Sequence, residues 1–121
     1  MFLKLDHQKL DVYTCSRVFV LECYKLTKSL PVDEKFGMIS QVRRAALSVH
    51  LNIAEGTSRK SGAERKRYYE VARGSVIEID GALDIATDLG YIKTIDTTNL
   101  GQSMIASFKL LTGLIKSEGK N

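Results

Sequence analysis

Apolar residues recur every three to four positions through four long segments of this sequence. A helix with 3.6 residues per turn places residues at that spacing along one side, where they can be buried together. The alternation with a period of two that marks a half-buried strand is absent. The spacing therefore predicts an all-α protein with helices over about residues 7–29, 37–55, 62–89 and 96–117.

Residues that end or begin helices stand between these segments. Pro31 disfavours a helical conformation in the residue before it, and Gly56 and Gly90 suit the position just beyond a helix end. Ser61, three residues before Glu64, has the pattern of a capping box at the start of a helix. Because the connections are short, the helices are expected to pack as an antiparallel up-down-up-down four-helix bundle.

A chain of 121 residues can bury one core, so we expect a single domain over residues 1–121. Cys15 and Cys23 lie about 12 Å apart on one predicted helix, too far for a disulfide, and are expected to be buried or half-buried thiols. The predicted inner stripes are Leu10, Tyr13, Val18, Leu21, Tyr24 and Leu26; Met38, Val42, Ala45, Val49 and Ile53; Tyr69, Ala72, Val76, Ile79, Leu83 and Ala86; and Leu100, Met104, Ser107 or Phe108, Leu111 and Ile115.

A second, polar stripe runs along the segment 37–55 and breaks the usual rules for a helix interior. Asn and Ser are poor helix formers, and a Glu near the last turn opposes the helix dipole. Folding the second and third helices into a hairpin about residues 57–62 places Arg44 near Ser75. The stripe consists of Gln41, Arg44, Ser48, Asn52 and Glu55.

Two interpretations of this stripe are open. In the first it is structural: Arg44 pairs with Glu78 across the bundle, and Ser48 and Ser75 allow a close approach of the two helices. In the same interpretation Asn52 and Glu55, with Gly56 after them, form a local cluster at the mouth of the hairpin. In the second interpretation the mouth is a recognition surface for a partner or another subunit.

The net charge of +4 lies entirely within residues 33–75, which hold nine basic and five acidic side chains. Cations next to aromatic rings are typical of single-stranded nucleic acid recognition, in which an aromatic ring offers a stacking surface. A solvated helix end is the alternative, because three consecutive cations fan around a helix. The candidate nucleic-acid-binding residues are Arg43, Arg59, Lys60, Arg65, Lys66, Arg67 and Tyr68.

Leu47, Leu51 and Ala54 form a further apolar patch outside the main stripe of their helix. One exposed leucine means little, but two on successive turns indicate burial against another copy of the chain. The patch is flanked by Arg43 and His50. Self-association is therefore expected.

Sequence motifs give little support for catalysis, and we expect a protein that is not an enzyme and needs no cofactor. His7 and His50 have no neighbouring nucleophile in a known arrangement, and no phosphate-binding loop occurs. Aspartates spaced four residues apart between positions 80 and 88 indicate a solvated acidic face rather than a metal site. The sequence starts without a secretion signal and holds no membrane span, so a cytoplasmic location is expected.

Three short stretches resemble a known family: Gln41-Val-Arg-Arg-Ala-Ala-Leu-Ser-Val, Asn52-Ile-Ala-Glu-Gly, and Ala72-Arg-Gly-Ser75 followed by Glu78. With Gly90-Tyr-Ile, they resemble the four-helix-bundle proteins encoded in intervening sequences of bacterial 23S rRNA genes, over about residues 10–114. His50 departs from the pattern, since relatives often carry Pro there. The family name records where the genes lie, so a ribosomal function does not follow from it.

The resemblance implies a left-handed bundle that assembles into a ring, a homopentamer. The chain is similar also to the accessory protein of diversity-generating retroelements, a basic pentameric barrel that binds nucleic acid and a reverse transcriptase. The leading hypothesis is a non-enzymatic homo-oligomer that binds RNA or DNA through its basic hairpin, alongside a protein partner in some cases. The rival hypothesis is an oligomeric protein–protein scaffold with no nucleic acid role.

Overall fold

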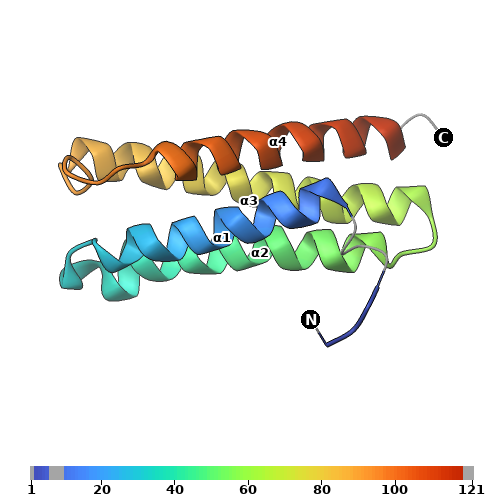
Figure 1. Ribbon diagram of the computed structural model, residues 1–121, viewed down its shortest axis with the longest axis horizontal. Helices are drawn as coiled ribbons and strands as arrows, with labels where there is room; N and C mark the ends of the chain where they lie inside the picture. Colours follow the sequence, from blue (N-terminus) through green and yellow to red (C-terminus); the bar gives the residue numbers. More distant parts are fainter. Residues whose placement is uncertain (1, 6–9, 119–121) are drawn as a thin grey trace.

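The computed structural model describes residues 2–5 and 10–118, and four long α-helices make up most of them (Figure 1). The helices are α1 (Asp11–Lys28), α2 (Ser40–Thr57), α3 (Gly62–Asp88) and α4 (Thr98–Glu118). Two short helical turns, η2 (Val32–Glu34) and η3 (Lys35–Ile39), connect α1 to α2. No strand occurs in the described ranges, so the all-α prediction is confirmed.

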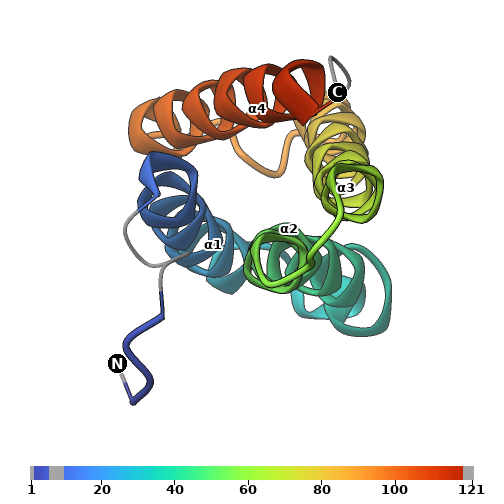
Figure 2. The ribbon, with the colours of Figure 1, turned by 90° about the vertical axis from the view of Figure 1, so that its right-hand side faces the viewer.

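The four helices stand at the corners of a square when the molecule is viewed along its long axis (Figure 2). Helices α1 and α3 each pack against both α2 and α4, so α1 and α3 occupy opposite corners. The α1–α2 and α3–α4 connections lie at one end of the molecule, and the α2–α3 connection lies at the other (Figure 1). None of these helices has the length and apolar character that a bilayer crossing demands.

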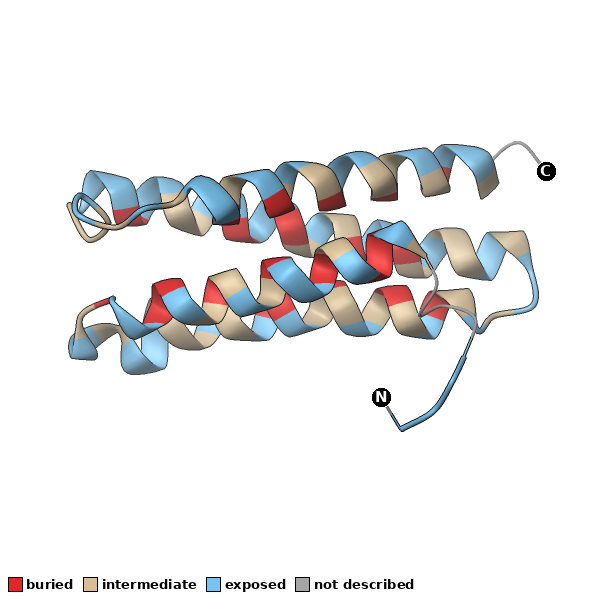
Figure 3. Cartoon of the chain, viewed as in Figure 1, coloured by how far each residue is buried: buried red, intermediate tan, exposed pale blue. Residues whose placement is uncertain are grey.

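One continuous apolar core fills the space between the helices, as the burial map shows (Figure 3). The inner stripes predicted for α2, α3 and α4 are buried or partly buried, and at the undecided position Ser107 is fully buried whereas Phe108 is 37% exposed. Cys23 is fully buried and Cys15 half-buried, as expected, and both are free thiols. Burial, followed by the nearby charge of Glu22, raises the pKa of Cys23 to about 12.

The inner stripe predicted for α1 is wrong at two positions. Val18 and Leu21 are 46% and 63% exposed, whereas Phe19 and the small residues Ser16 and Cys23 are completely buried. The sequence misled because α1 carries large apolar residues around much of its circumference, while small polar residues take several of the inner positions. Helix α1 therefore presents an apolar surface to solvent as well as to the core.

The predicted end of the second helix is also wrong, for a reason that matters to the site. Gly56 is buried inside α2, which continues to Thr57 and ends at Ser58. A Cβ atom at position 56 would lie 2.7 Å from the Cβ of Tyr68 and 3.1 Å from the ring of Tyr69. Gly56 therefore serves a close approach of α3 rather than a helix end.

The other helix boundaries agree better with the sequence. Ser61 caps α3, accepting a hydrogen bond from the Glu64 backbone N–H at 3.1 Å, and Gly90 follows α3 with a φ of 75°. Helix α2 starts three residues later than predicted, because the backbone at Gly37 is not helical. The start predicted for the first helix at residues 7–9 lies outside the described residues.

The register of α2 against α3 differs from the predicted one by about one helical turn. Ser75 Oγ donates a hydrogen bond to Ser48 Oγ at 3.0 Å, so Ser48 rather than Arg44 lies opposite Ser75. Because Gly56 lies against Tyr68, residues 62–67 extend beyond the end of α2 (Figure 1). The predicted register rested on the turn alone and assumed that the end of α2 and the start of α3 lie at the same height along the bundle axis.

The predicted pairing of Arg44 with Glu78 across the bundle is absent. Both side chains are exposed, and no ion pair joins them among the described residues. Ser48 and Ser75, by contrast, are half-buried and allow the close approach that the structural interpretation expected. Gln41 is exposed at the start of the same stripe.

Candidate nucleic-acid interface

Six of the seven candidate nucleic-acid-binding residues meet where α2 ends and α3 begins. The overhanging first turns of α3 carry four of them, and the loop before α3 carries the other two. We call this cluster the basic end, and it consists of Arg59, Lys60, Arg65, Lys66, Arg67 and Tyr68.

Arg59 is the organising side chain of the basic end. Its Nη2 donates hydrogen bonds to Glu55 Oε1 at 2.6 Å and to Tyr68 Oη at 2.9 Å. The guanidinium carbon also lies 4.9 Å from the centroid of the Tyr68 ring, a cation–π distance. Burial lowers the pKa of Arg59, but Tyr68 and Glu55 more than offset it and hold the pKa above its ordinary value. The local cluster expected at the hairpin mouth thus holds Glu55, but the expectation is wrong for Asn52, which bonds Ser48 one turn earlier in α2.

Tyr68 holds a second cation next to the first. The Arg67 guanidinium carbon lies 5.7 Å from the Tyr68 ring centroid, so one ring contacts two guanidinium groups. Arginine planes and tyrosine rings both stack on nucleic acid bases. The arrangement therefore offers a mixed cationic and aromatic surface, in which Tyr68 positions Arg59 and Arg67 rather than standing free as a lone ring.

Arg65 has a different role from its neighbours. Its Nε donates a hydrogen bond to Glu118 Oε2 at 2.7 Å, at the last residue of α4. Its Nη1 donates to the carbonyl oxygens of Arg59 and Lys60 at 3.0 and 2.9 Å. Arg65 therefore ties the loop before α3 to the end of α4, and most of its donors are engaged within the protein.

Three cations of the basic end remain without an anionic partner. Lys60 and Arg67 are exposed and Lys66 is half-buried, and none of the three forms an ion pair with another described residue. Arg59 and Arg65, in contrast, are held by Glu55 and Glu118. Within the basic end, the positive charge available to a ligand is therefore that of Lys60, Lys66 and Arg67.

The structure does not bring Arg43 to the basic end. Arg43 lies sixteen residues before Arg59, which corresponds to about 24 Å along a helix axis. Its Nε donates a hydrogen bond to Thr27 Oγ1 at 2.8 Å, and its guanidinium carbon lies 4.8 Å from the Tyr24 ring centroid. Arg43 therefore joins α2 to α1 near the opposite end of the molecule.

The remaining polar-stripe residues form contacts within α2 and toward α3. Asn52 Nδ2 donates hydrogen bonds to the Ser48 carbonyl at 2.8 Å and to Ser48 Oγ at 3.1 Å. Ser48 is in turn bonded to Ser75. Leu47 and Leu51 are exposed, as the predicted apolar patch requires, whereas Ala54, its third member, is partly buried against the core.

Two partners in these contacts could not be found from the sequence. Glu118 lies 53 positions from Arg65, and no local pattern links the two residues. His50, expected beside the apolar patch, contacts α1 instead, with Nδ1 2.7 Å from Ser16 Oγ and its ring centroid 4.4 Å from that of Tyr13. The only indication of the His50 contact in the sequence was Ser16, a serine at a helix position where an apolar residue would be expected.

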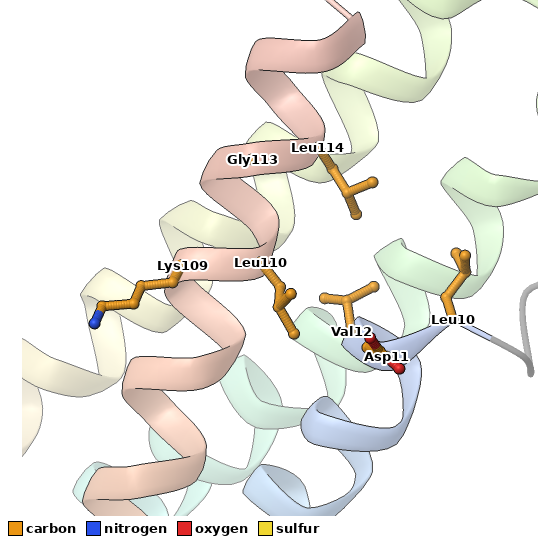
Figure 4. A pocket seen from close by; sticks show the side chains of 7 residues that line it. All are labelled: Leu10, Asp11, Val12, Lys109, Leu110, Gly113 and Leu114. Carbon is orange, nitrogen blue, oxygen red and sulfur yellow. The ribbon is translucent and has the colours of Figure 1, made fainter.

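A separate hollow of about 350 Å³ lies between the first turn of α1 and the second half of α4 (Figure 4). Leu10, Val12, Leu110 and Leu114 surround it, while the Lys109 side chain extends away from it (Figure 4). Its walls are mainly apolar, in contrast to the basic end. Within residues 2–5 and 10–118, no group of three His, Cys, Asp or Glu side chains is placed to hold a metal ion.

Comparison with known proteins agrees with the short stretches noted in the sequence. Among curated proteins, a search finds no match to the chain. The family described as 23S rRNA-intervening sequence protein, however, matches residues 8–113, nearly the whole chain. The chain therefore belongs to the 23S rRNA-intervening sequence protein family.

Proposed function

We propose that this protein is a non-enzymatic homo-oligomer that binds RNA or DNA electrostatically through its basic end. The observation that carries the proposal is the group of three unpaired cations, Lys60, Lys66 and Arg67, on the overhanging end of the α2–α3 hairpin. Cations without an intramolecular partner can neutralise phosphates, and each phosphate neutralised releases a counterion. The adjacent Arg59–Tyr68–Arg67 stack adds a surface for unpaired bases.

The fold proposed for each subunit is the left-handed up-down-up-down antiparallel bundle. The placement of successive connections at alternate ends supports this arrangement (Figure 1). The assembly proposed is a ring, for which the family resemblance implies five subunits. Exposed apolar side chains on all four helices support self-association, among them Leu21, Leu51, Ile77 and Ile105.

Salt dependence of binding tests the nucleic-acid part of the proposal. Affinity for labelled single-stranded RNA and for duplex DNA should fall steeply as potassium chloride is added, as measured by fluorescence anisotropy. Replacing Lys60, Lys66 and Arg67 together by Gln should weaken binding and reduce the magnitude of the slope of log K against log salt by about 2 for single-stranded RNA and about 3 for duplex DNA. The three side chains are not part of the core, so circular dichroism should show an unchanged fold.

A matched variant at other exposed cations serves as the control. Replacing Lys35, Lys93 and Lys109 by Gln removes the same charge outside the basic end and should leave most of the affinity and the slope in place. Equal losses in the two variants would show that binding follows net charge alone. Wild-type binding that does not depend on salt would contradict the proposal.

The second candidate function is a protein–protein scaffold with no nucleic acid role. The exposed apolar residues that support self-association also favour this candidate, because a scaffold binds its partners through apolar surfaces and does not require unpaired cations. A stable oligomer that shows no salt-dependent binding to RNA or DNA would favour this candidate. In that case the basic end would be the place to look for an acidic protein partner.

A further inference from the structure

The outward face of α3 is unusual for a helix surface in water. Ile77 and Ile85 are 56% and 53% exposed, and Val71 is exposed on the neighbouring turn. Carboxylates border these apolar residues, and no ion pair engages any of them among the described residues. The bordering carboxylates are Glu70, Glu78, Asp84 and Asp88.

Two glycines lie on the same face, seven residues apart, which is close to two helical turns. Gly74 and Gly81 are exposed, and a Cβ atom at either position would meet nothing within 4 Å. Glycine is an unfavourable residue in a helix interior, and no contact with another described residue explains either position. The space beside Ile77 is therefore open at both glycines, which leaves room for the side chains of a second helix.

Helix α1 carries an outward face of the opposite charge. Val18 and Leu21, the two residues wrongly expected in the core, are exposed there. Three exposed cations surround them, and among the described residues only Lys25 of the three forms an ion pair, with Glu22 at 3.1 Å. The cations are Arg17, Lys25 and Lys28.

The two faces cannot meet within one molecule. Helices α1 and α3 occupy opposite corners of the bundle, so their outward faces point in opposite directions (Figure 2). One face is apolar with cations and the other is apolar with carboxylates. When the α1 face of one copy contacts the α3 face of another, the pair still has one free α1 face and one free α3 face. Further copies can therefore add in the same way, until the assembly closes into a ring or extends as a filament.

Contacts within the bundle set the relative heights of the two faces. Ser16 contacts His50 and Thr27 contacts Arg43, so residue numbers decrease along α2 in the direction in which they increase along α1. Ser48 contacts Ser75 and Thr57 contacts Tyr69, so residue numbers decrease along α3 in the direction in which they increase along α2. Helices α1 and α3 therefore run in the same direction.

These contacts also match individual residues of the two faces. Ser16 contacts His50 of α2, and the Ser48–Ser75 contact places His50 level with about Arg73 of α3. By the same reasoning, Thr27 contacts Arg43 of α2, which lies level with about Asp80 of α3. Within about one turn, Leu21 is then level with Ile77. Arg17 lies level with the stretch from Glu70 to Glu78, and Lys28 lies level with the stretch from Gly81 to Asp84. In a ring whose axis is parallel to the helices, neighbouring subunits are at the same height along that axis. The apolar residues of the α1 face then lie opposite those of the α3 face, and the cations of the α1 face lie opposite the carboxylates of the α3 face.

We propose that the outward face of α1 in one copy docks on the outward face of α3 in the next copy. The proposal rests on the self-association in the proposed function, and it names the two surfaces that make the contact. Leu47 and Leu51 flank His50, which contacts α1, and they extend the α1 side of the contact. The occupant of the α3 face is thus a second copy of this chain.

Charge reversal on each face gives a direct test. One variant carries Glu78→Lys and Asp84→Lys, and the other carries Arg17→Glu and Lys28→Glu. All four side chains are exposed, and no ion pair holds any of them among the described residues, so each variant should fold, as judged by circular dichroism. Either variant alone places like charges across the contact and should sediment at the monomer mass at concentrations where the wild type assembles.

An equimolar mixture of the two variants should assemble again. In the mixture, the unchanged α1 face of one variant meets the unchanged α3 face of the other, and the two reversed faces also attract. Native mass spectrometry should then find mixed complexes in which the two variants alternate, as heterodimers or short open chains, because a closed ring of five must contain one contact between like variants. The control variant, Lys35→Glu with Lys93→Glu, reverses the same number of charges away from both faces and should assemble as the wild type does.

Three outcomes would overturn the inference. Assembly of each variant alone, at wild-type concentrations, would show that copies meet through other faces, and the proposed function would stand. A mixture that stays monomeric would show that the two faces are not complementary. A wild type that is monomeric throughout the micromolar range would overturn this inference together with the oligomeric part of the proposed function, whereas RNA or DNA binding is measured separately at the basic end.

Discussion

At the residue scale, glycine acts in two opposite ways in this bundle. Gly56 is buried where α2 meets α3, and a Cβ atom there would lie 2.7 Å from the Cβ of Tyr68. Gly113 is exposed in the second half of α4, and a Cβ atom there would meet nothing within 4 Å. Both positions are helical, so helix propensity favours alanine at each, and only packing distinguishes them.

Replacing Gly56 by Ala should lower the free energy of unfolding by about 1–3 kcal/mol, because the added methyl group forces α3 away from α2. Replacing Gly113 by Ala should raise it by up to about 1 kcal/mol, because nothing opposes the better helix former. Urea denaturation followed by circular dichroism measures both changes. A Gly56→Ala protein as stable as the Gly113→Ala protein would contradict the close approach described at the hairpin mouth.

At the element scale, the inner faces of three helices were predictable and that of one was not. In α2, α3 and α4 the spacing alone identified Val49, Ile79 and Leu111 as core, although these helices also carry exposed apolar residues. Helix α1 has large apolar residues on two sides. Burial of Ser16 and exposure of Leu21 follow from the fit against α2 and α4, which no single-helix pattern contains.

The link between the basic end and the end of α4 makes a second prediction. The Arg65–Glu118 ion pair is 2.7 Å long, and the two side chains are only 27% and 18% exposed. Replacing Glu118 by Gln should lower the free energy of unfolding by about 1 kcal/mol, because it weakens a partly desolvated charge-assisted hydrogen bond. Hydrogen exchange should also become faster at the backbone amides of residues 58–61.

Asp80→Asn is the control, since Asp80 is exposed, lies far from the loop before α3, and is engaged by no ion pair among the described residues. It should change stability and exchange much less than Glu118→Gln. The same exchange rates in the two variants would show that Arg65 does not anchor the loop through Glu118.

At the scale of the whole molecule, the register of the helices was beyond the sequence. The predicted hairpin placed Arg44 opposite Ser75, and the structure places Ser48 there. Six of the seven candidate nucleic-acid-binding residues lie at the basic end, and Arg43 does not, because it is separated from the others by most of the length of α2. Their role in binding stays a prediction. Contacts such as Arg65 with Glu118 join distant segments and depend on that register.

A bulky residue on the outward face of α3 tests the assembly without changing charge. Gly81→Leu should leave the stability of the subunit equal or higher, since Leu is a better helix former and the position is open. It should also weaken assembly at least tenfold, because the gap that receives the next subunit is filled. Sedimentation measures the assembly, and thermal unfolding measures the subunit.

Gly113→Leu, on α4, is the control, and it should leave the association constant unchanged. Equal association of the Gly81→Leu and Gly113→Leu proteins would show that the α3 face is not buried between copies.

The overhang of α3 beyond α2 gives the molecule a direction along its long axis. If copies repeat side by side at one height, every overhang emerges on the same rim, and the opposite rim carries the exposed Phe36 and Val32 instead. A flexible polyanion lying across the cationic rim would touch several subunits at once. Contacts that are weak singly then add through effective concentration, so avidity should depend on the length of the strand as much as on its sequence.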